Sequence, residues 1–125
     1  MKYKAIFFDR DGTLTYYNPQ KEIWRDQIIS EWSGKPFALS YEKMMRLFLL
    51  ASEGKKSWYK TLEDERVFFL RFYWHLLVQE GIKEKIDSRA KRLLDELWCN
   101  GDRILYPETV EVMTYFCRHG YKMGV

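Results

Sequence analysis

Two acidic residues near the start of the chain, Asp9 and Asp11, have the type and spacing for chemistry on a phosphate group. Residues i and i+2 of an extended chain point to the same side, so both carboxylates can face one substrate. One aspartate can attack phosphorus and form an aspartyl-phosphate, while the other acts first as a general acid and then as a general base. Gly12 permits a sharp turn after the pair, and the Thr13 hydroxyl can bind the loop backbone.

Phosphoryl transfer places a further demand on this pair. The reaction needs an in-line nucleophile, a proton donor for the leaving oxygen and positive charge that offsets the phosphate. The two aspartates supply the first two and add negative charge of their own. A cation must therefore join them, and oxygen ligands favour Mg²⁺ over zinc.

Short apolar segments are expected to position the pair. Residues 3–8 are apolar and aromatic without alternation, which predicts a strand buried on both faces of a parallel sheet. Asp9 then lies at the carboxyl end of this strand, where open parallel sheets bind their ligands. Residues 121–125 form a second strand candidate, preceded by a helix predicted to begin at Pro107 and to end before Gly120.

The long segment between these strands, from about residue 15 to residue 103, is predicted to be helical. Gly and polar residues divide it into four helices of ordinary length. Their expected limits are residues 21–32, a start after the N-cap Ser40 and a stop at Gly54, a start at Thr61 with Asp64 completing a capping box, and an apolar repeat from Ile82 to Leu97 that stops at Gly101.

Residues 7–14, which read Phe-Phe-Asp-Arg-Asp-Gly-Thr-Leu, resemble the first signature motif of the haloacid dehalogenase (HAD) superfamily, hhhDxDGT[LV], and match it completely. Residues 105–125 are similar to the family segment that leads into its second motif, with Glu108 where that segment usually has Gly. The resemblance implies that Asp9 is the nucleophile and a metal ligand. It implies that Asp11 is the general acid and base, and that its backbone carbonyl also binds Mg²⁺.

The resemblance also implies an architecture and an activity. We expect an α/β fold with a partial Rossmann-like core of parallel strands, residues 1–14 and 104–125, and an inserted all-helical cap of type C1, residues 15–103. The implied function is that of a Mg²⁺-dependent phosphatase acting on a small phosphorylated metabolite, because dehalogenases of the superfamily lack the second aspartate. A phosphomutase, or a non-catalytic helical interaction module derived from the fold, is the alternative.

Three further family motifs, a Ser or Thr, a Lys and an acidic pair, are expected beyond Val125. We therefore expect residues 1–125 to be the N-terminal portion of a longer protein, to be completed by another chain segment, or to form a dimer. These residues alone should have negligible phosphatase activity. The hydrolysis of phosphate monoesters depends on electrostatic stabilisation that two aspartates cannot provide.

Composition limits the other classes of function. The 125 residues are 46% hydrophobic and 31% charged, which is typical of a folded globular protein. The net charge of +3 arises from interspersed residues, so no nucleic-acid partner is expected, and Lys55-Lys56 with Trp58 and Tyr59 is interpreted as a solvated loop. No apolar stretch is long enough for a signal peptide or a membrane span. Two cysteines without ligand spacing indicate neither a disulfide framework nor a zinc site, which favours the cytoplasm.

Overall fold

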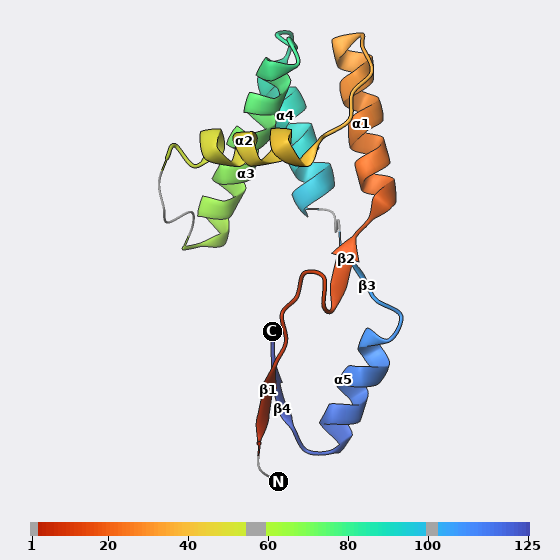
Figure 1. Ribbon diagram of the computed structural model, residues 1–125. Helices are drawn as coiled ribbons and strands as arrows, with labels where there is room; N and C mark the ends of the chain where they lie inside the picture. The colour runs from red at the N-terminus through yellow and green to blue at the C-terminus, as the bar shows by residue number, and fades with distance from the viewer. Residues whose placement is uncertain (1–2, 55–59, 100–102) are drawn as a thin grey trace. The chain divides into compact units, whose positions relative to one another are not determined.

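The computed structural model describes residues 3–54, 60–99 and 103–125 (Figure 1). Two compact units divide the chain, one within Met1–Asn18 and Arg103–Val125 and the other within Pro19–Asp102. We call them the α/β unit and the helical unit. Their elements, in chain order, are β1 (Ala5–Phe7), β2 (Thr15–Tyr17), α1 (Pro19–Ser33), α2 (Tyr41–Ala51), α3 (Leu62–Gln79), α4 (Ile86–Leu94), the π-helical turn η1 (Asp95–Cys99), β3 (Arg103–Leu105), α5 (Thr109–Arg118) and β4 (Lys122–Gly124).

The α/β unit contains the predicted pair of parallel strands. β1 lies beside β4 with Ile6 opposite Met123. At one end of the pair, the Lys122 N–H donates a backbone hydrogen bond to the Lys4 carbonyl, which extends the pairing. The helix between β3 and β4, α5, packs against this pair through Phe116, whose ring centroid lies 6.0 Å from that of Phe8. This arrangement, together with the helical unit, confirms the predicted α/β fold class.

The burial predicted for the first strand is wrong. Ala5 and Phe7 are both exposed, and the Phe7 side chain is 83% accessible to solvent. A parallel strand is buried on both faces only where helices cover both faces of its sheet. Within the described residues of this unit, α5 is the only helix, and β1 pairs with β4 alone.

A second pair of strands lies at the two ends of the segment predicted to be helical. β2 and β3 pair antiparallel, with Thr15 opposite Leu105 and Tyr17 opposite Arg103. Each strand has only three residues, which is too short for a period of two to appear in the sequence. These strands belong to the α/β unit, and the chain between them forms the helical unit.

The starts of two helices in the helical unit follow directly from side-chain chemistry. The Ser40 hydroxyl accepts a hydrogen bond from the Lys43 backbone N–H, which confirms Ser40 as the N-cap of α2. The Thr61 hydroxyl accepts from the Asp64 N–H, and the Asp64 carboxylate accepts from the Thr61 N–H, so the predicted capping box is complete.

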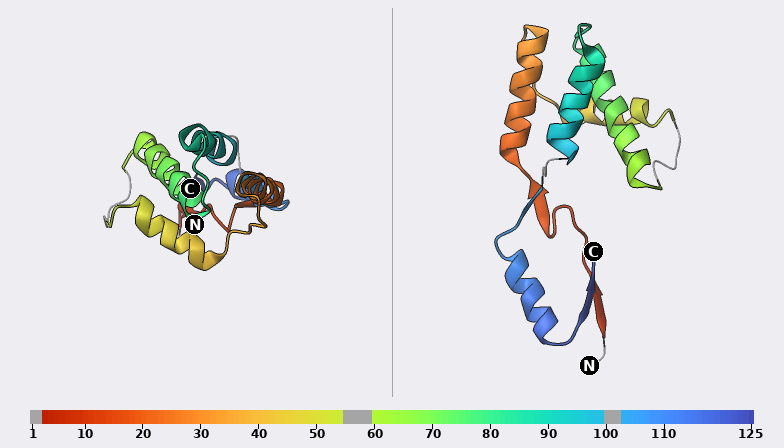
Figure 2. Two further views of the ribbon diagram at one scale, coloured as in Figure 1. Left: turned by 90° about the horizontal axis from the view of Figure 1, so that it is seen from above. Right: turned by 180° about the vertical axis from the view of Figure 1, so that it is seen from behind.

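The helical unit has a continuous apolar core. The α2 helix lies across α3, and α4 runs beside α3 (Figure 1 and Figure 2). Phe48 on α2 stacks with Phe68 on α3, with ring centroids 5.8 Å apart. The largest fully buried side chains are Ile29, Leu47, Leu76, Leu77, Leu93 and Leu94. Phe72 and Tyr73 on α3 are also buried in this core.

The fourth helix differs from its prediction at its start. Ile82 is buried as expected, but α4 begins only at Ile86, because Lys85 before it adopts a left-handed backbone conformation with φ +50°. The helix continues into η1, and its predicted stop at Gly101 lies outside the described residues. In the part of the chain that the structure describes, no helix is long and apolar enough to cross a membrane.

Candidate active site

The loop after β1 carries the predicted site residues. Asp9 follows the strand at its carboxyl end, and the chain turns at Gly12, whose φ of +77° lies in the left-handed region that glycine adopts without a Cβ penalty. The Arg10 carbonyl accepts hydrogen bonds from the backbone N–H groups of Leu14 and Thr15, both at 3.0 Å. The Gly12 N–H donates to the Thr15 carbonyl at 2.8 Å. These bonds define the path of the loop that presents Asp9 and Asp11.

A different threonine from the one predicted ties this loop to its backbone. The hydroxyl of Thr15 donates to the Arg10 carbonyl at 3.2 Å, and Thr15 is buried, whereas Thr13 is exposed. The Leu14 carbonyl accepts two more hydrogen bonds, from the Tyr106 N–H at 3.1 Å and from the Thr109 hydroxyl at 2.8 Å. The start of α5 therefore supports the loop from its buried side.

The two aspartates differ in their charged surroundings. Asp11 forms an ion pair with Arg10, whose Nε lies 2.9 Å from Oδ1, and a second with Arg103, whose Nη2 lies 3.4 Å from Oδ2. Both carboxylate oxygens of Asp11 are thus engaged by guanidinium groups. The carboxylate of Asp9 is exposed and makes no ion pair with any residue that the structure describes.

Arg103 is the residue at this site that the sequence did not reveal. It belongs to β3, 92 positions from Asp11 along the chain, and its guanidinium lies 3.6 Å from the centroid of the Tyr17 ring. Neither spacing nor a motif links it to the aspartates. Arg103 reaches the site through the register of two three-residue strands, and this register becomes visible only once the fold is known.

The oxygen atoms of this loop suit a hard cation. In the described parts of the chain, no three His, Cys, Asp or Glu side chains gather into a ready-made metal site. Mg²⁺ does not need one, because it usually keeps several waters and binds one or two carboxylates together with substrate phosphate. The exposed carboxylate of Asp9 and the backbone carbonyl of Asp11 are donors of that kind. The carbonyl of Arg10 is already used within the loop.

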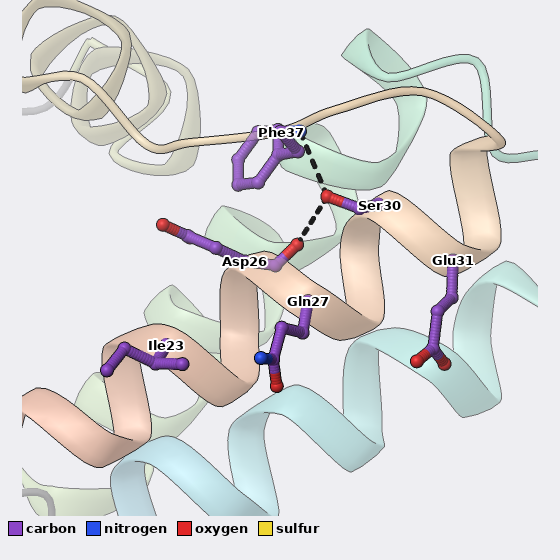
Figure 3. Close-up of a pocket in the computed structure, with 6 residues that line it drawn as sticks. All are labelled: Ile23, Asp26, Gln27, Ser30, Glu31 and Phe37. Carbon is purple, nitrogen blue, oxygen red and sulfur yellow. Dashed lines mark hydrogen bonds between the residues drawn. The ribbon is translucent and has the colours of Figure 1, made fainter.

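A separate depression lies on the helical unit, along α1 and the segment after it. Its lining residues are Ile23, Asp26, Gln27, Ser30, Glu31 and Phe37 (Figure 3). The Ser30 hydroxyl donates to the Asp26 carbonyl at 2.7 Å and accepts from the Phe37 N–H at 2.9 Å, which fastens this segment to the helix. The Asp26 carboxylate is paired with Arg25 at 2.8 Å. Ser30 and Asp26 thus serve the local structure.

Two other sets of residues noted in the sequence do not extend the site. Cys99 and Cys117 are free thiols, and both are exposed. The basic and aromatic residues Lys55, Lys56, Trp58 and Tyr59 lie outside the described residues.

Comparison with known proteins assigns the family. The model of a haloacid dehalogenase-like hydrolase family matches residues 3–125, which include the aspartate loop, the helical unit and both pairs of strands. No curated protein and no solved structure matches the chain. The family predicted from residues 7–14 and 105–125 is confirmed, and the chain belongs to the haloacid dehalogenase-like hydrolases.

Proposed function

We propose that this hydrolase is a Mg²⁺-dependent phosphatase that removes the phosphate of a small phosphorylated metabolite through an aspartyl-phosphate. One observation carries the proposal: a hydrolase-family chain presents two aspartates, Asp9 and Asp11, in one tight loop at the carboxyl end of a parallel strand. Asp9 is the nucleophile, and Asp11 is the general acid and base.

In the first half of the reaction, a carboxylate oxygen of Asp9 attacks phosphorus. The bond between phosphorus and the ester oxygen breaks, and its electron pair stays with the ester oxygen. The Asp11 carboxyl donates a proton to that oxygen, so the leaving group departs as a neutral alcohol. The carboxylate of Asp9 is exposed and makes no ion pair within the described residues, so it can approach a phosphate from solvent.

In the second half, a water molecule attacks the phosphorus of the aspartyl-phosphate. Asp11, now ionised, accepts the proton of this water, and the bond between phosphorus and the Asp9 oxygen breaks. Inorganic phosphate leaves, Asp9 is again a carboxylate and Asp11 is again protonated. The two residues therefore return to their starting states after one turnover.

The residues that would hold Mg²⁺ are Asp9, through its carboxylate, and Asp11, through its backbone carbonyl. When bound, the ion offsets the negative charge of the phosphate and of the attacking carboxylate. The positive charges that the described structure itself brings to the loop, on Arg10 and Arg103, are directed at the Asp11 side chain.

We further propose that the helical unit, Pro19–Asp102, is the cap that was expected at residues 15–103, with β2 and β3 at its two ends. The unit is inserted between β2 and β3, at the place in the chain that is expected for a cap of type C1. The proposed substrate is a small metabolite in the cytoplasm, with no nucleic-acid partner. The free cysteines accord with a reducing compartment.

The proposal is tested by assaying the purified natural protein with p-nitrophenyl phosphate and Mg²⁺. Asp9→Asn should abolish turnover, Asp11→Asn should lower it strongly, and EDTA should remove it reversibly. Glu111→Gln is the matched control, because it removes one exposed carboxylate from α5 in the same unit and should leave turnover intact. Turnover that survives Asp9→Asn would exclude this mechanism, and a natural protein without turnover would favour a non-catalytic role.

A further inference from the structure

We propose that Arg103 is a positioning residue that aims the carboxylate of Asp11 at the leaving group. The proposal rests on the function proposed above and names a residue outside the aspartate motif. It starts from one contact within the α/β unit: Nη2 of Arg103, on β3, lies 3.4 Å from Oδ2 of Asp11, in the loop after β1.

Contacts other than the one with Asp11 hold Arg103 in place. Its backbone is paired with Tyr17 in the β2–β3 register, and its guanidinium lies over the ring of the same residue at 3.6 Å. An arginine stacked on an aromatic face gains a cation–π interaction and loses less entropy on forming each hydrogen bond than a freely moving side chain. Its side chain is also only 21% exposed. Arg103 can therefore hold the Asp11 side chain in one direction.

Arg10 cannot hold the Asp11 side chain in the same way. It is the immediate neighbour of Asp11 in the same loop, and its side chain is 58% exposed. An ion pair between exposed side chains contributes little rigidity, because solvent screens it and both side chains keep alternative rotamers. Within the described residues, the contact from β3 connects Asp11 to a different part of the fold.

The direction of the Asp11 carboxyl group matters most in the step in which it donates its proton to the leaving oxygen. A general acid must be within hydrogen-bond reach of the atom that it protonates. Without Arg103, the Asp11 side chain keeps its ion pair with Arg10 among the described residues, and it can rotate away from the ester oxygen. The loss of activity on removing Arg103 should therefore be large for a substrate with a poor leaving group. It should be small for a substrate with a good leaving group, which departs without a proton.

The test compares kcat/KM for phenyl phosphate, a poor leaving group, with that for 2,4-dinitrophenyl phosphate, a good one, in the natural protein with Mg²⁺. This constant reports the steps up to the aspartyl-phosphate, so hydrolysis of the intermediate does not enter. Arg103→Ala should lower kcat/KM for phenyl phosphate about a hundredfold, with KM little changed, and that for the dinitrophenyl ester less than about threefold. Arg103→Lys should recover part of the loss, and Asp11→Asn should show the same dependence on the leaving group.

Two further variants keep the test decisive. Arg118→Ala removes an exposed arginine from α5 and should leave kcat/KM unchanged for both substrates. If Arg103→Ala does not fold, as judged by circular dichroism, Tyr17→Leu should give a weaker form of the same selective loss, because it removes the ring that holds Arg103.

The outcomes separate the two proposals. Turnover that persists in Asp9→Asn overturns the phosphatase mechanism itself. If Asp9→Asn is inactive but Arg103→Ala lowers kcat/KM equally for both esters, or acts only through KM, Arg103 binds phosphate or supports the fold and the positioning role is wrong.

Discussion

The hydroxyl of Thr109 donates a 2.8 Å hydrogen bond to the carbonyl oxygen of Leu14, and both residues are buried. This bond joins the first turn of α5 to the end of the aspartate loop, across 95 positions of sequence. The Tyr106 N–H binds the same carbonyl at 3.1 Å. The chain around Pro107 therefore supports the loop from which Asp9 and Asp11 are presented.

Replacing Thr109 should loosen this support. Thr109→Val keeps the shape of the side chain but removes the donor, and should lower the free energy of unfolding by about 1–2 kcal/mol, measured by urea denaturation. Thr109→Ser keeps the hydroxyl and should preserve most of that bond. Equal stability of the valine and serine variants would show that the hydrogen bond to Leu14 contributes little.

Glu80, at the end of α3, should stabilise the helical unit as an anion. Its side chain is only 5% exposed and pairs with Lys43 and with Lys35, the latter at 3.2 Å. Glu80→Gln should lower the free energy of unfolding at neutral pH by about 1–3 kcal/mol, because a charged acceptor is lost. Glu84→Gln, which changes an exposed carboxylate nearby, is the control and should have little effect.

The contribution of Glu80 should also depend on pH. Burial alone would raise the pKa of Glu80, but the hydrogen bonds and charges of Lys43 and Lys35 outweigh it and hold the pKa below its usual 4.5. The ionised side chain therefore stabilises the fold fully above pH 4.5, and this stabilisation is lost as the pH falls through the lower pKa of the folded state. The stability difference between the native protein and Glu80→Gln should shrink in that acidic range. A difference that stays constant there would contradict the assignment.

Two leucines of α2 test where the helical core lies. Leu47 is fully buried, whereas Leu49 is 65% exposed on the same helix. Leu47→Ala should lower the free energy of unfolding by about 3 kcal/mol, since it removes packed methyl groups and leaves a cavity. Leu49→Ala makes the same chemical change at the surface and should cost less than about 0.5 kcal/mol in thermal or urea denaturation.

Local chemistry explains which parts of the fold could be predicted. The hydroxyl of Ser40 and the Thr61–Asp64 pair start helices through bonds to residues three positions away, so their signal is complete within one turn. Gly12 marks its turn because few other residues adopt φ of +77°. The aspartate motif sufficed to place Asp9 and Asp11 in one loop and to assign the family.

What could not be predicted depends on contacts between distant segments. The strands β2 and β3 become visible only through their pairing, and that pairing brings Arg103 to Asp11. The ion pairs of Glu80 join the end of α3 to α2 and to the segment before it. The exposure of Phe7 depends on which helices cover β1, a property of the sheet that an apolar sequence does not determine.

The residue that becomes phosphorylated during turnover tests the central claim most directly. The natural protein is mixed with p-nitrophenyl phosphate and Mg²⁺, quenched in acid and treated with borohydride, which reduces an aspartyl-phosphate to homoserine, and the products are mapped by mass spectrometry. We predict homoserine at position 9, and none in protein treated without substrate. Turnover without modification of Asp9, or with modification of another residue, would contradict the assignment of Asp9 as the nucleophile.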